Sequence, residues 1–196
     1  MGILLEAVCG SVDEALAAGA AGADRLEVCA ALPTGGVTPS IGMIDEIKSR
    51  VALPVVAMIR SHEGAMTASP AEVAAMARDI RTLPADEFVF GILHAHGKID
   101  EDAVLRLRDA ADGRTCCFHR VFDSLAEPAN ALERLIEWGF RRVLTSGGAA
   151  TAPEGADAIR GLVEQLAGRI DILPGGGIRP GNARRLIETT GCRQLH

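Results

Sequence analysis

The sequence predicts an α/β fold of the (βα)8 TIM-barrel type that lacks its eighth helix, formed by a single domain over residues 1–196. Short runs rich in β-branched residues alternate with longer Ala-rich amphipathic stretches. The strand-like runs begin roughly every 21 to 32 residues, the length of one βα unit. Aromatic residues make up only 3% of the chain, and tyrosine is absent. A core of Ala, Val, Ile and Leu suits helices packed on a parallel sheet.

The expected elements follow one another along the whole chain. Strands are expected over Leu4–Cys9, Arg25–Cys29, Val55–Ile59, Glu87–Gly91, Thr115–His119, Arg142–Ser146, Ile170–Leu173 and Arg193–His196. Helices are expected over Val12–Ala20, Ile41–Arg50, Pro70–Leu83, Glu101–Ala111, Pro128–Trp138, Gly155–Ala167 and Pro180–Thr190. Prolines, which fit the first turn of a helix, stand at three of these starts: Pro70, Pro128 and Pro180. Glycines that can end a helix precede three strands: Gly22, Gly139 and Gly168.

The main alternative architecture is an open, doubly wound sheet. The dinucleotide-binding pattern G-x-G-x-x-G is absent, since Pro180 occupies the third glycine position after Gly175 and Gly177. No Walker A sequence is present either. We therefore expect no nucleotide cofactor.

Charge and composition exclude several classes of protein. Lys and Arg total 20 against 26 Asp and Glu, a net charge of −6, which disfavours nucleic-acid binding. No segment has the ~18 to 20 apolar residues of a membrane helix, so no membrane partner is expected. The start of the chain lacks the basic residues of a secretory signal, and its five cysteines are scattered. This pattern predicts reduced thiols in the cytoplasm.

Two glycine-rich segments follow the sixth and seventh expected strands. In a TIM barrel the active face lies at the carboxyl ends of the strands, and glycines there let backbone N–H groups approach an anion. The candidate anion-binding or substrate-binding residues are Ser146, Gly147, Gly148, Gly175, Gly176 and Gly177. The alternative is that these glycines only form tight turns between strand and helix.

Charged residues interrupt or end several of the apolar strands. A carboxylate inside a barrel is costly unless it is paired, so Glu6 and Glu27 are candidates for acid–base chemistry together with Arg60 and His119. The alternative is an ion-pair layer that only fills the barrel. Asp123 completes the candidate catalytic set.

The segment from His119 to Asp123 is dense in ionisable groups. Arg120 could hold a carboxylate or phosphate, or pair with Asp123 instead. If the strand is regular there, His119 and Arg120 point to opposite faces.

Cys9 and Cys29 end two sequential strands and are the candidate metal ligands. Two thiolates at neighbouring strand ends could hold a soft ion such as Cu(I). The alternative is that both are small buried apolar side chains.

Five strings in order along the chain resemble the CutC copper-homeostasis family. They are Gly22-Ala-Asp-Arg-Leu-Glu-Val-Cys29, Gly35-Gly-Val-Thr-Pro-Ser40, Phe118-His-Arg-Val-Phe-Asp123, Arg142-Val-Leu-Thr-Ser-Gly-Gly148 and Pro174-Gly-Gly-Gly-Ile178. The resemblance implies a cytoplasmic (βα)8 barrel, a homodimer or higher homo-oligomer, associated with copper tolerance. Its shared polar residues would be Glu6, Glu27, Cys29, Arg60, His119, Arg120, Asp123, Ser146 and His196.

The sequence departs from the family pattern in three places. Val8 stands where the family has a cysteine. The family loop Arg-Pro-Arg-Gly-Gly reads Arg60-Ser-His-Glu-Gly64 here, so His62 replaces an arginine. The chain ends at His196, short of the family's usual length, which predicts either a shortened chain or a partner subunit over the uncovered face.

Two functions from different classes follow. The resemblance implies a cytoplasmic copper-homeostasis protein that binds Cu(I). The polar residues favour an alternative, a TIM-barrel enzyme acting on a small phosphorylated or carboxylated metabolite at the carboxyl ends of the strands. The sequence leaves open whether the protein is an enzyme.

Overall fold

The computed structural model describes residues 2–166 and 168–196. Its strands are β1 (Leu4–Cys9), β2 (Arg25–Val28), β3 (Val55–Met58), β4 (Glu87–Phe90), β5 (Thr115–Phe118), β6 (Arg142–Thr145), β7 (Asp171–Pro174) and β8 (Gln194–Leu195). Its α-helices are α1 (Val12–Ala20), α2 (Ile41–Arg50), α3 (Pro70–Thr82), α4 (Glu101–Ala110), α5 (Pro128–Glu137), α6 (Ala156–Leu166) and α7 (Pro180–Thr190). Two short 3-10 helices, η1 (Leu32–Thr34) and η2 (Arg120–Ser124), were not expected from the sequence.

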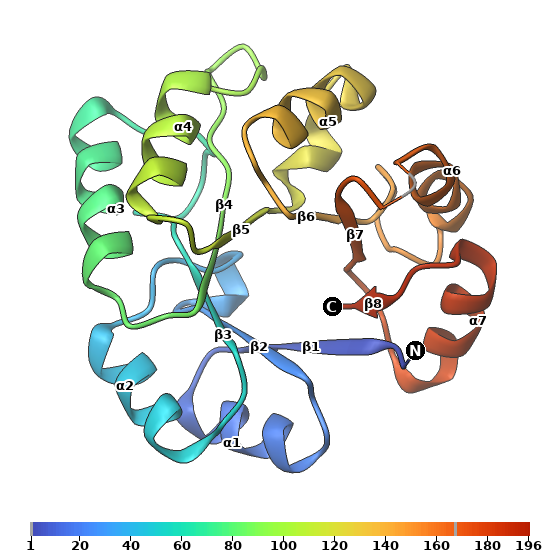
Figure 1. The fold of residues 1–196 in the computed structure, drawn as a ribbon, viewed down its shortest axis with the longest axis horizontal. Coiled ribbons are helices and arrows are strands. Elements are labelled where there is room, and N and C mark those ends of the chain that lie inside the picture. The colour runs from blue at the N-terminus through green and yellow to red at the C-terminus, as the bar shows by residue number, and fades with distance from the viewer. Residues whose placement is uncertain (1, 167) are drawn as a thin grey trace. The chain divides into compact units, whose positions relative to one another are not determined.

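The strands form one sheet in the order β7-β6-β5-β4-β3-β2-β1-β8, and the described strand pairs are parallel. One α-helix follows each strand from β1 to β7, and within the described residues none follows β8 (Figure 1). This is the element order of a (βα)8 fold without its eighth helix. In the part of the chain that the structure describes, no helix combines the length and the apolar character of a membrane span.

The chain divides into two compact units. The N-terminal unit is Glu6–Cys116, and its helices α1 to α4 lie on one face of its strands (Figure 1). Strand β3 is buried along its whole length, which fits the apolar run Val55-Val-Ala-Met58. Helix α3 buries Val73, Met76, Ala77 and Ile80, a spacing of three and four residues that places them on one side of the helix.

The C-terminal unit contains the remaining described residues, 2–5, 117–166 and 168–196. Its β6 pairs with β5 and β7, and the start of β1 pairs with β8 through Leu4 and Gln194. The backbone N–H of His196 donates to the Pro174 carbonyl over 2.8 Å, which joins the end of the chain to β7. Helix α5 buries Leu132 and Leu135 against this sheet.

The predicted boundaries are close to the observed ones, and the differences have physical causes. Pro70, Pro128 and Pro180 each begin a helix, as expected. Strands β2 to β6 end one residue earlier than predicted. For β6 the cause is visible, because the Ser146 N–H donates to the Asp123 carboxylate and not to a neighbouring strand. The predicted last residue of the sixth helix, Ala167, lies outside the described residues.

Candidate functional site

Polar residues at the strand ends gather in one cluster in each unit. We call the first the carboxylate–thiol cluster: Glu6, Cys9, Arg25, Glu27, Cys29, Met58 and Arg60, all in the N-terminal unit. We call the second the Asp123 cluster: His119, Arg120, Asp123, Thr145, Ser146 and the glycines of the two loops, all in the C-terminal unit. The five predicted catalytic residues therefore divide between the two clusters, with Glu6, Glu27 and Arg60 in the first.

Glu6 and Glu27 are buried, with 6% and 3% of their surface exposed. The register of β1 and β2 places Glu6 beside Arg25, and Arg25 Nε donates to Glu6 Oε2 in a buried ion pair. One carboxylate oxygen of Glu6 and one of Glu27 lie within 4.8 Å of each other. The Glu6 carboxylate is thus part of an ion pair with Arg25. For this residue the pairing favours the alternative of an ion-pair layer over acid–base chemistry. Arg25 is a charged residue inside an apolar strand, the same criterion that singled out the two glutamates.

Cys9 and Cys29 are both buried, but the strand register separates their side chains. Cys9 pairs with Val28, not with Cys29. Because side chains alternate along a strand, Cys9 shares a face with Val28, and Cys29 lies on the opposite face with Glu27. The register therefore does not bring the two thiols to one face of the sheet, and we retain Cys29 alone as the candidate metal ligand.

The surroundings of both thiols favour the protonated form. Burial, helped by the charges of Glu14 and Glu27, raises the pKa of Cys9 to about 11. Burial, helped first by Glu27, raises the pKa of Cys29 to about 12. A metal ion at Cys29 would have to displace a proton.

Met58 is a second candidate sulfur ligand, and the sequence reasoning missed it. The pairing of Val28 with Ala57 continues to Cys29 and Met58, which puts their side chains on one face. Gly36 lies over both of them with a φ of +82°. A Cβ at Gly36 would lie 3.3 Å from Cys29 Sγ and 3.4 Å from Met58 Cε. The sequence shows that a methionine lies in the strand after the one that precedes Cys29. It does not show the register between β2 and β3, which places the two side chains together.

Arg60 lies two residues after the end of β3 and is 7% exposed. Its guanidinium donates to the carbonyls of Gly64 over 2.7 Å, Gly36 over 3.2 Å and Thr34 over 3.5 Å. Its Nε is buried and has no acceptor among the described residues. The Arg60 guanidinium therefore links the loop at Gly36 to the loop at Gly64, and its Nε–H has no acceptor among the described residues.

In the Asp123 cluster, β5 ends at Phe118, so His119 and Arg120 do not continue a regular strand. His119 caps η2, and its Nδ1 accepts the Val121 N–H over 3.3 Å. This bond leaves Nδ1 without a proton, and in the neutral ring the proton is on Nε2. The condition for His119 and Arg120 to point to opposite faces, a regular strand, is not met, because Arg120 begins η2 and its Nε donates to Asp123.

Asp123 accepts hydrogen bonds on both carboxylate oxygens. Oδ1 accepts from Thr145 Oγ1 and from the Gly148 N–H, and Oδ2 accepts from the Ser146 N–H over 2.9 Å. Arg120 Nε donates to Oδ2 over 3.2 Å. Burial alone would raise the pKa of Asp123, but the hydrogen bonds led by Thr145 outweigh it and hold the pKa below its usual value. This saturation suits a positioning role better than proton transfer.

The two glycine loops differ in what their N–H groups do. In the loop after β6, the N–H groups of Ser146 and Gly148 donate to Asp123, and that of Gly147 donates to Thr145 Oγ1 over 2.9 Å. The carboxylate of Asp123 therefore occupies the position that an anionic ligand would need. A Cβ at Gly147 would lie 2.5 Å from the Gly155 carbonyl oxygen, so this glycine serves the turn itself.

In the loop after β7, the Gly175 N–H donates to the Thr145 carbonyl, whereas the N–H groups of Gly176 and Gly177 have no acceptor among the described residues. Gly176 lies against Arg120, and a Cβ there would be 2.8 Å from Arg120 Nη1. Arg120 Nη2 donates to Ser146 Oγ over 2.8 Å. Among the described residues predicted to bind an anion, Gly176 and Gly177 therefore differ from Ser146, Gly147 and Gly148 in having N–H groups without an acceptor.

The fold and the polar strand ends define a TIM-barrel protein with buried ionisable residues at the carboxyl ends of its strands. Comparison with known proteins identifies the family. The CutC family profile matches residues 3–196. A copper homeostasis protein cutC homolog from Homo sapiens is 41% identical over 198 residues, covering 100% of this chain and 72% of that protein. A CutC family protein from Porphyromonas gingivalis is 44% identical, covering 100% and 80%. The chain belongs to the CutC family, which confirms the resemblance.

A solved structure confirms the fold class. The crystal structure of a CutC protein from Streptococcus agalactiae has a TM-score of 0.93 and 31% identity, covering 99% of this chain and 97% of that one. The structure of a 2,3-dimethylmalate lyase has a TM-score of 0.65 at 14% identity, and this likeness concerns the fold alone.

Proposed function

We propose that this protein takes part in copper homeostasis by binding Cu(I) in the cytoplasm, with the Cys29 thiolate and the Met58 thioether as ligands. The observation that carries the proposal is that Cys29 Sγ and Met58 Cε both lie next to Gly36, on the side where another residue would have its Cβ. Thiolate and thioether sulfur are soft donors, and Cu(I) is the soft ion that they select. Membership of the CutC family supports the copper assignment.

Charge also favours a monovalent ion at this position. Cys29 is 1% exposed and Met58 is 7% exposed, so the site excludes most water. One thiolate and one Cu(I) ion form a neutral pair, whereas a divalent ion would leave a net charge that is costly to bury. The five cysteines are free thiols, which suits a reducing compartment.

The enzyme alternative has less support in the geometry. Glu6 is paired with Arg25, and Asp123 has hydrogen bonds on both oxygens. Neither is placed to exchange a proton with a substrate without first losing those bonds.

Anaerobic titration with Cu(I) against a competing chelator tests the proposal. We expect Cys29→Ser to weaken Cu(I) binding by far more than tenfold and Met58→Leu, which conserves volume, by about tenfold. Cys9→Ser is the matched control, because this thiol is equally buried but lies on the other face. Unchanged affinity in Cys29→Ser would refute the proposal, and an equal loss in Cys9→Ser would point to a two-thiol site instead.

A further inference from the structure

The loop between β4 and α4, in the N-terminal unit, presents two histidines to solvent. Leu93 and Ile99 form an antiparallel bridge that closes this loop into a short hairpin. Inside the hairpin the His94 N–H donates to the Lys98 carbonyl over 2.8 Å. His94 and His96 are both exposed in the turn between the two bridge residues. The bridge and the hydrogen bond therefore hold the two histidines in one ordered turn.

The imidazole rings of His94 and His96 lie together although both are exposed. Their centres are 5.1 Å apart, and their planes differ by 12°. In a zinc site each nitrogen is about 2.0 to 2.1 Å from the ion, which puts the ring centre roughly 3.2 Å from it, and two rings on one tetrahedral ion then have centres roughly 5.2 Å apart. The observed spacing therefore fits two imidazoles on one ion. Because the rings are nearly parallel, each has to turn about its χ2 bond, a soft torsion, to direct a nitrogen at the ion.

Asp100 orients the ring of His94. Its Oδ2 lies 3.5 Å from His94 Nδ1, and its Oδ1 accepts the Ala103 N–H over 3.1 Å as the N-cap of α4. A carboxylate at this position favours the tautomer with the proton on Nδ1, which leaves the lone pair of Nε2 for a metal ion. Histidines that bind metals commonly have such a carboxylate beside their second ring nitrogen.

We propose that His94 and His96 together bind one divalent transition-metal ion, each through a single imidazole nitrogen, with water in the remaining positions. Imidazole nitrogen suits Zn²⁺, Ni²⁺ and Cu²⁺, whereas soft sulfur ligands select Cu(I). The site goes beyond the proposed Cu(I) function, because it is exposed, uses nitrogen donors and shares no ligand with the buried Cys29 and Met58.

The charges around the turn favour a positive ion. Asp100 is the N-cap of α4, and Glu101 and Asp102 follow it in the first turn of that helix. Lys98, in the turn itself, offsets one of these three negative charges. The segment from His94 to Asp102 is therefore negatively charged, which lowers the electrostatic cost of bringing a divalent ion to two neutral imidazoles.

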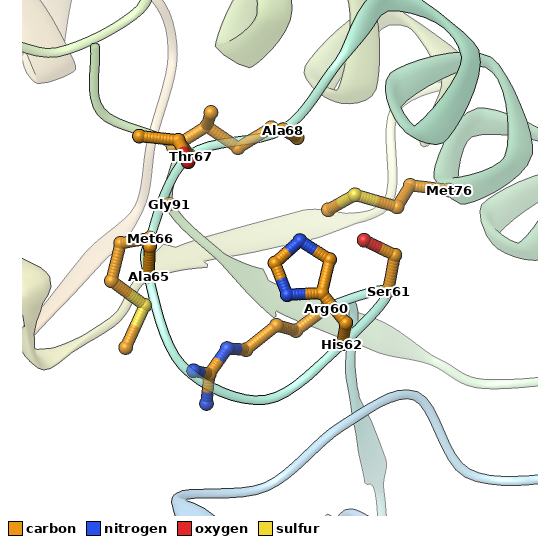
Figure 2. A pocket seen from close by; sticks show the side chains of 10 residues that line it. Arg60, Ser61, His62, Ala65, Met66, Thr67, Ala68, Met76 and Gly91 are labelled. Atoms are coloured by element: carbon orange, nitrogen blue, oxygen red, sulfur yellow. The ribbon is translucent and has the colours of Figure 1, made fainter. Parts of the chain in front are cut away.

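His62 provides a matched comparison in the same unit. Its Nε2 lies 3.3 Å from Glu72 Oε1, so it is paired with a carboxylate as His94 is. The His62 and His94 side chains are 41% and 46% exposed. Figure 2 shows His62 among the side chains that line a small pocket, and within the described residues its contacts include no second imidazole. The two positions thus differ mainly in the neighbour that His96 supplies.

Titration of the ¹⁵N-labelled full chain with Zn²⁺, followed through the imidazole nitrogen signals, tests the proposal. Zn²⁺ has no redox chemistry, so it does not oxidise the free thiols. We expect the signals of His94 and His96 to move together and to saturate with one Kd, whereas those of His62 stay in place. No movement of the His94 and His96 signals up to about 1 mM Zn²⁺, enough to half-fill a site with a Kd near that value, would overturn the proposal. Movement of the His62 signals over the same range would also overturn it, because a lone exposed histidine would then bind equally well.

Two exposed substitutions make the test specific. His96→Gln leaves His94 with its carboxylate alone, the arrangement of His62, and we expect the Kd for Zn²⁺ at His94 to rise at least tenfold, because a second donor held nearby adds a high effective concentration. His62→Gln is the control and should leave that Kd unchanged. The same Kd at His94 in His96→Gln as in the parent protein would refute the two-histidine site.

Asp100→Asn tests the positioning role of the carboxylate. Asn keeps an oxygen for the N-cap of α4 but loses the negative charge beside His94. We expect the Nδ1-protonated tautomer of His94 to become less populated in the metal-free protein and the Kd for Zn²⁺ to rise about tenfold. An unchanged tautomer together with an unchanged Kd would refute the role of Asp100.

Discussion

Replacing Asp123 with Asn should destabilise the protein more than most single substitutions of a partly buried polar residue. The side chain is 12% exposed, and its two oxygens accept bonds from Thr145, Ser146, Gly148 and Arg120. Asn keeps one carbonyl oxygen and replaces the other with a donor, which leaves at least two donors without their acceptor. Hydrogen bonds to a charged group contribute about 1.5 to 3 kcal/mol each, so for two lost bonds we expect a loss of about 3 to 6 kcal/mol.

This loss can be converted into a melting temperature. The entropy of unfolding is about 2.1 cal/mol/K per residue, or about 0.4 kcal/mol/K for a chain of this length, so Tm should fall by about 7 to 15 °C. The pH dependence has a definite sign. The folded-state pKa of Asp123 is lowered, so its stabilisation is present above the unfolded-state pKa near 3.9 and is lost as pH falls through the folded-state value. The difference in Tm between the parent protein and the variant should therefore become smaller below about pH 4.

Thermal unfolding at pH 7 and at steps down to about pH 3 measures both effects. Glu133→Gln is the control, because Glu133 is an exposed carboxylate that pairs with Arg169 on the surface. We expect almost no change in Tm from that substitution. A fall of less than about 2 °C for Asp123→Asn at pH 7, or a gap that stays constant to low pH, would show that the hydrogen bonds of Asp123 do not stabilise the fold as argued.

Three further predictions address other parts of the structure. Gly147→Ala should lower the free energy of unfolding in urea by at least about 2 kcal/mol, because φ is +72° and the new Cβ would lie 2.5 Å from a carbonyl oxygen. Gly148→Ala is the control, with a φ of +75° but open space around the new Cβ, and it should lower the free energy of unfolding by about 1 kcal/mol. Equal losses in the two variants would contradict the clash at Gly147. Cu(I) affinity should rise about tenfold per pH unit from pH 6 to 8, because the pKa of Cys29 is about 12 and one proton must leave; a rise of about a hundredfold per pH unit would indicate two thiols. Glu6→Gln should lower the free energy of unfolding by about 3 to 5 kcal/mol, because it removes the carboxylate that pairs with the buried Arg25; an unchanged urea midpoint would show that this ion pair does not stabilise the fold.

The order and type of the elements could be predicted because each rests on local chemistry. The apolar run of β3 and the three- and four-residue spacing of α3 are visible in the sequence itself. The proline at the start of α5 indicates the first turn of a helix, and this signal does not depend on contacts with distant parts of the chain. The 3-10 helix η2 could not be predicted in this way, because it depends on the Asp123 carboxylate meeting β6 far along the chain.

The site was harder to predict, because it depends on register. A shift of one residue between β1 and β2 would have placed Cys9 beside Cys29, and only the pairing of Cys9 with Val28 shows that they face opposite ways. A second register, that between β2 and β3, places Met58 next to Cys29. Both cysteines lie at strand ends in the sequence, so their positions alone cannot distinguish these arrangements.

The two glycine loops show why composition alone cannot identify an anion site. Both loops carry consecutive glycines after a strand, and both were candidates for the same reason. In the loop after β6 the N–H groups of Ser146 and Gly148 donate to the Asp123 carboxylate, which occupies the place of an anionic ligand. Arg60 was a candidate for a different reason, as a charged residue after an apolar strand, and the structure shows its guanidinium donating to the carbonyls of Thr34, Gly36 and Gly64. In both cases the residue type could be read from the sequence, but the partners that already satisfy its hydrogen bonds could be seen only in the folded chain.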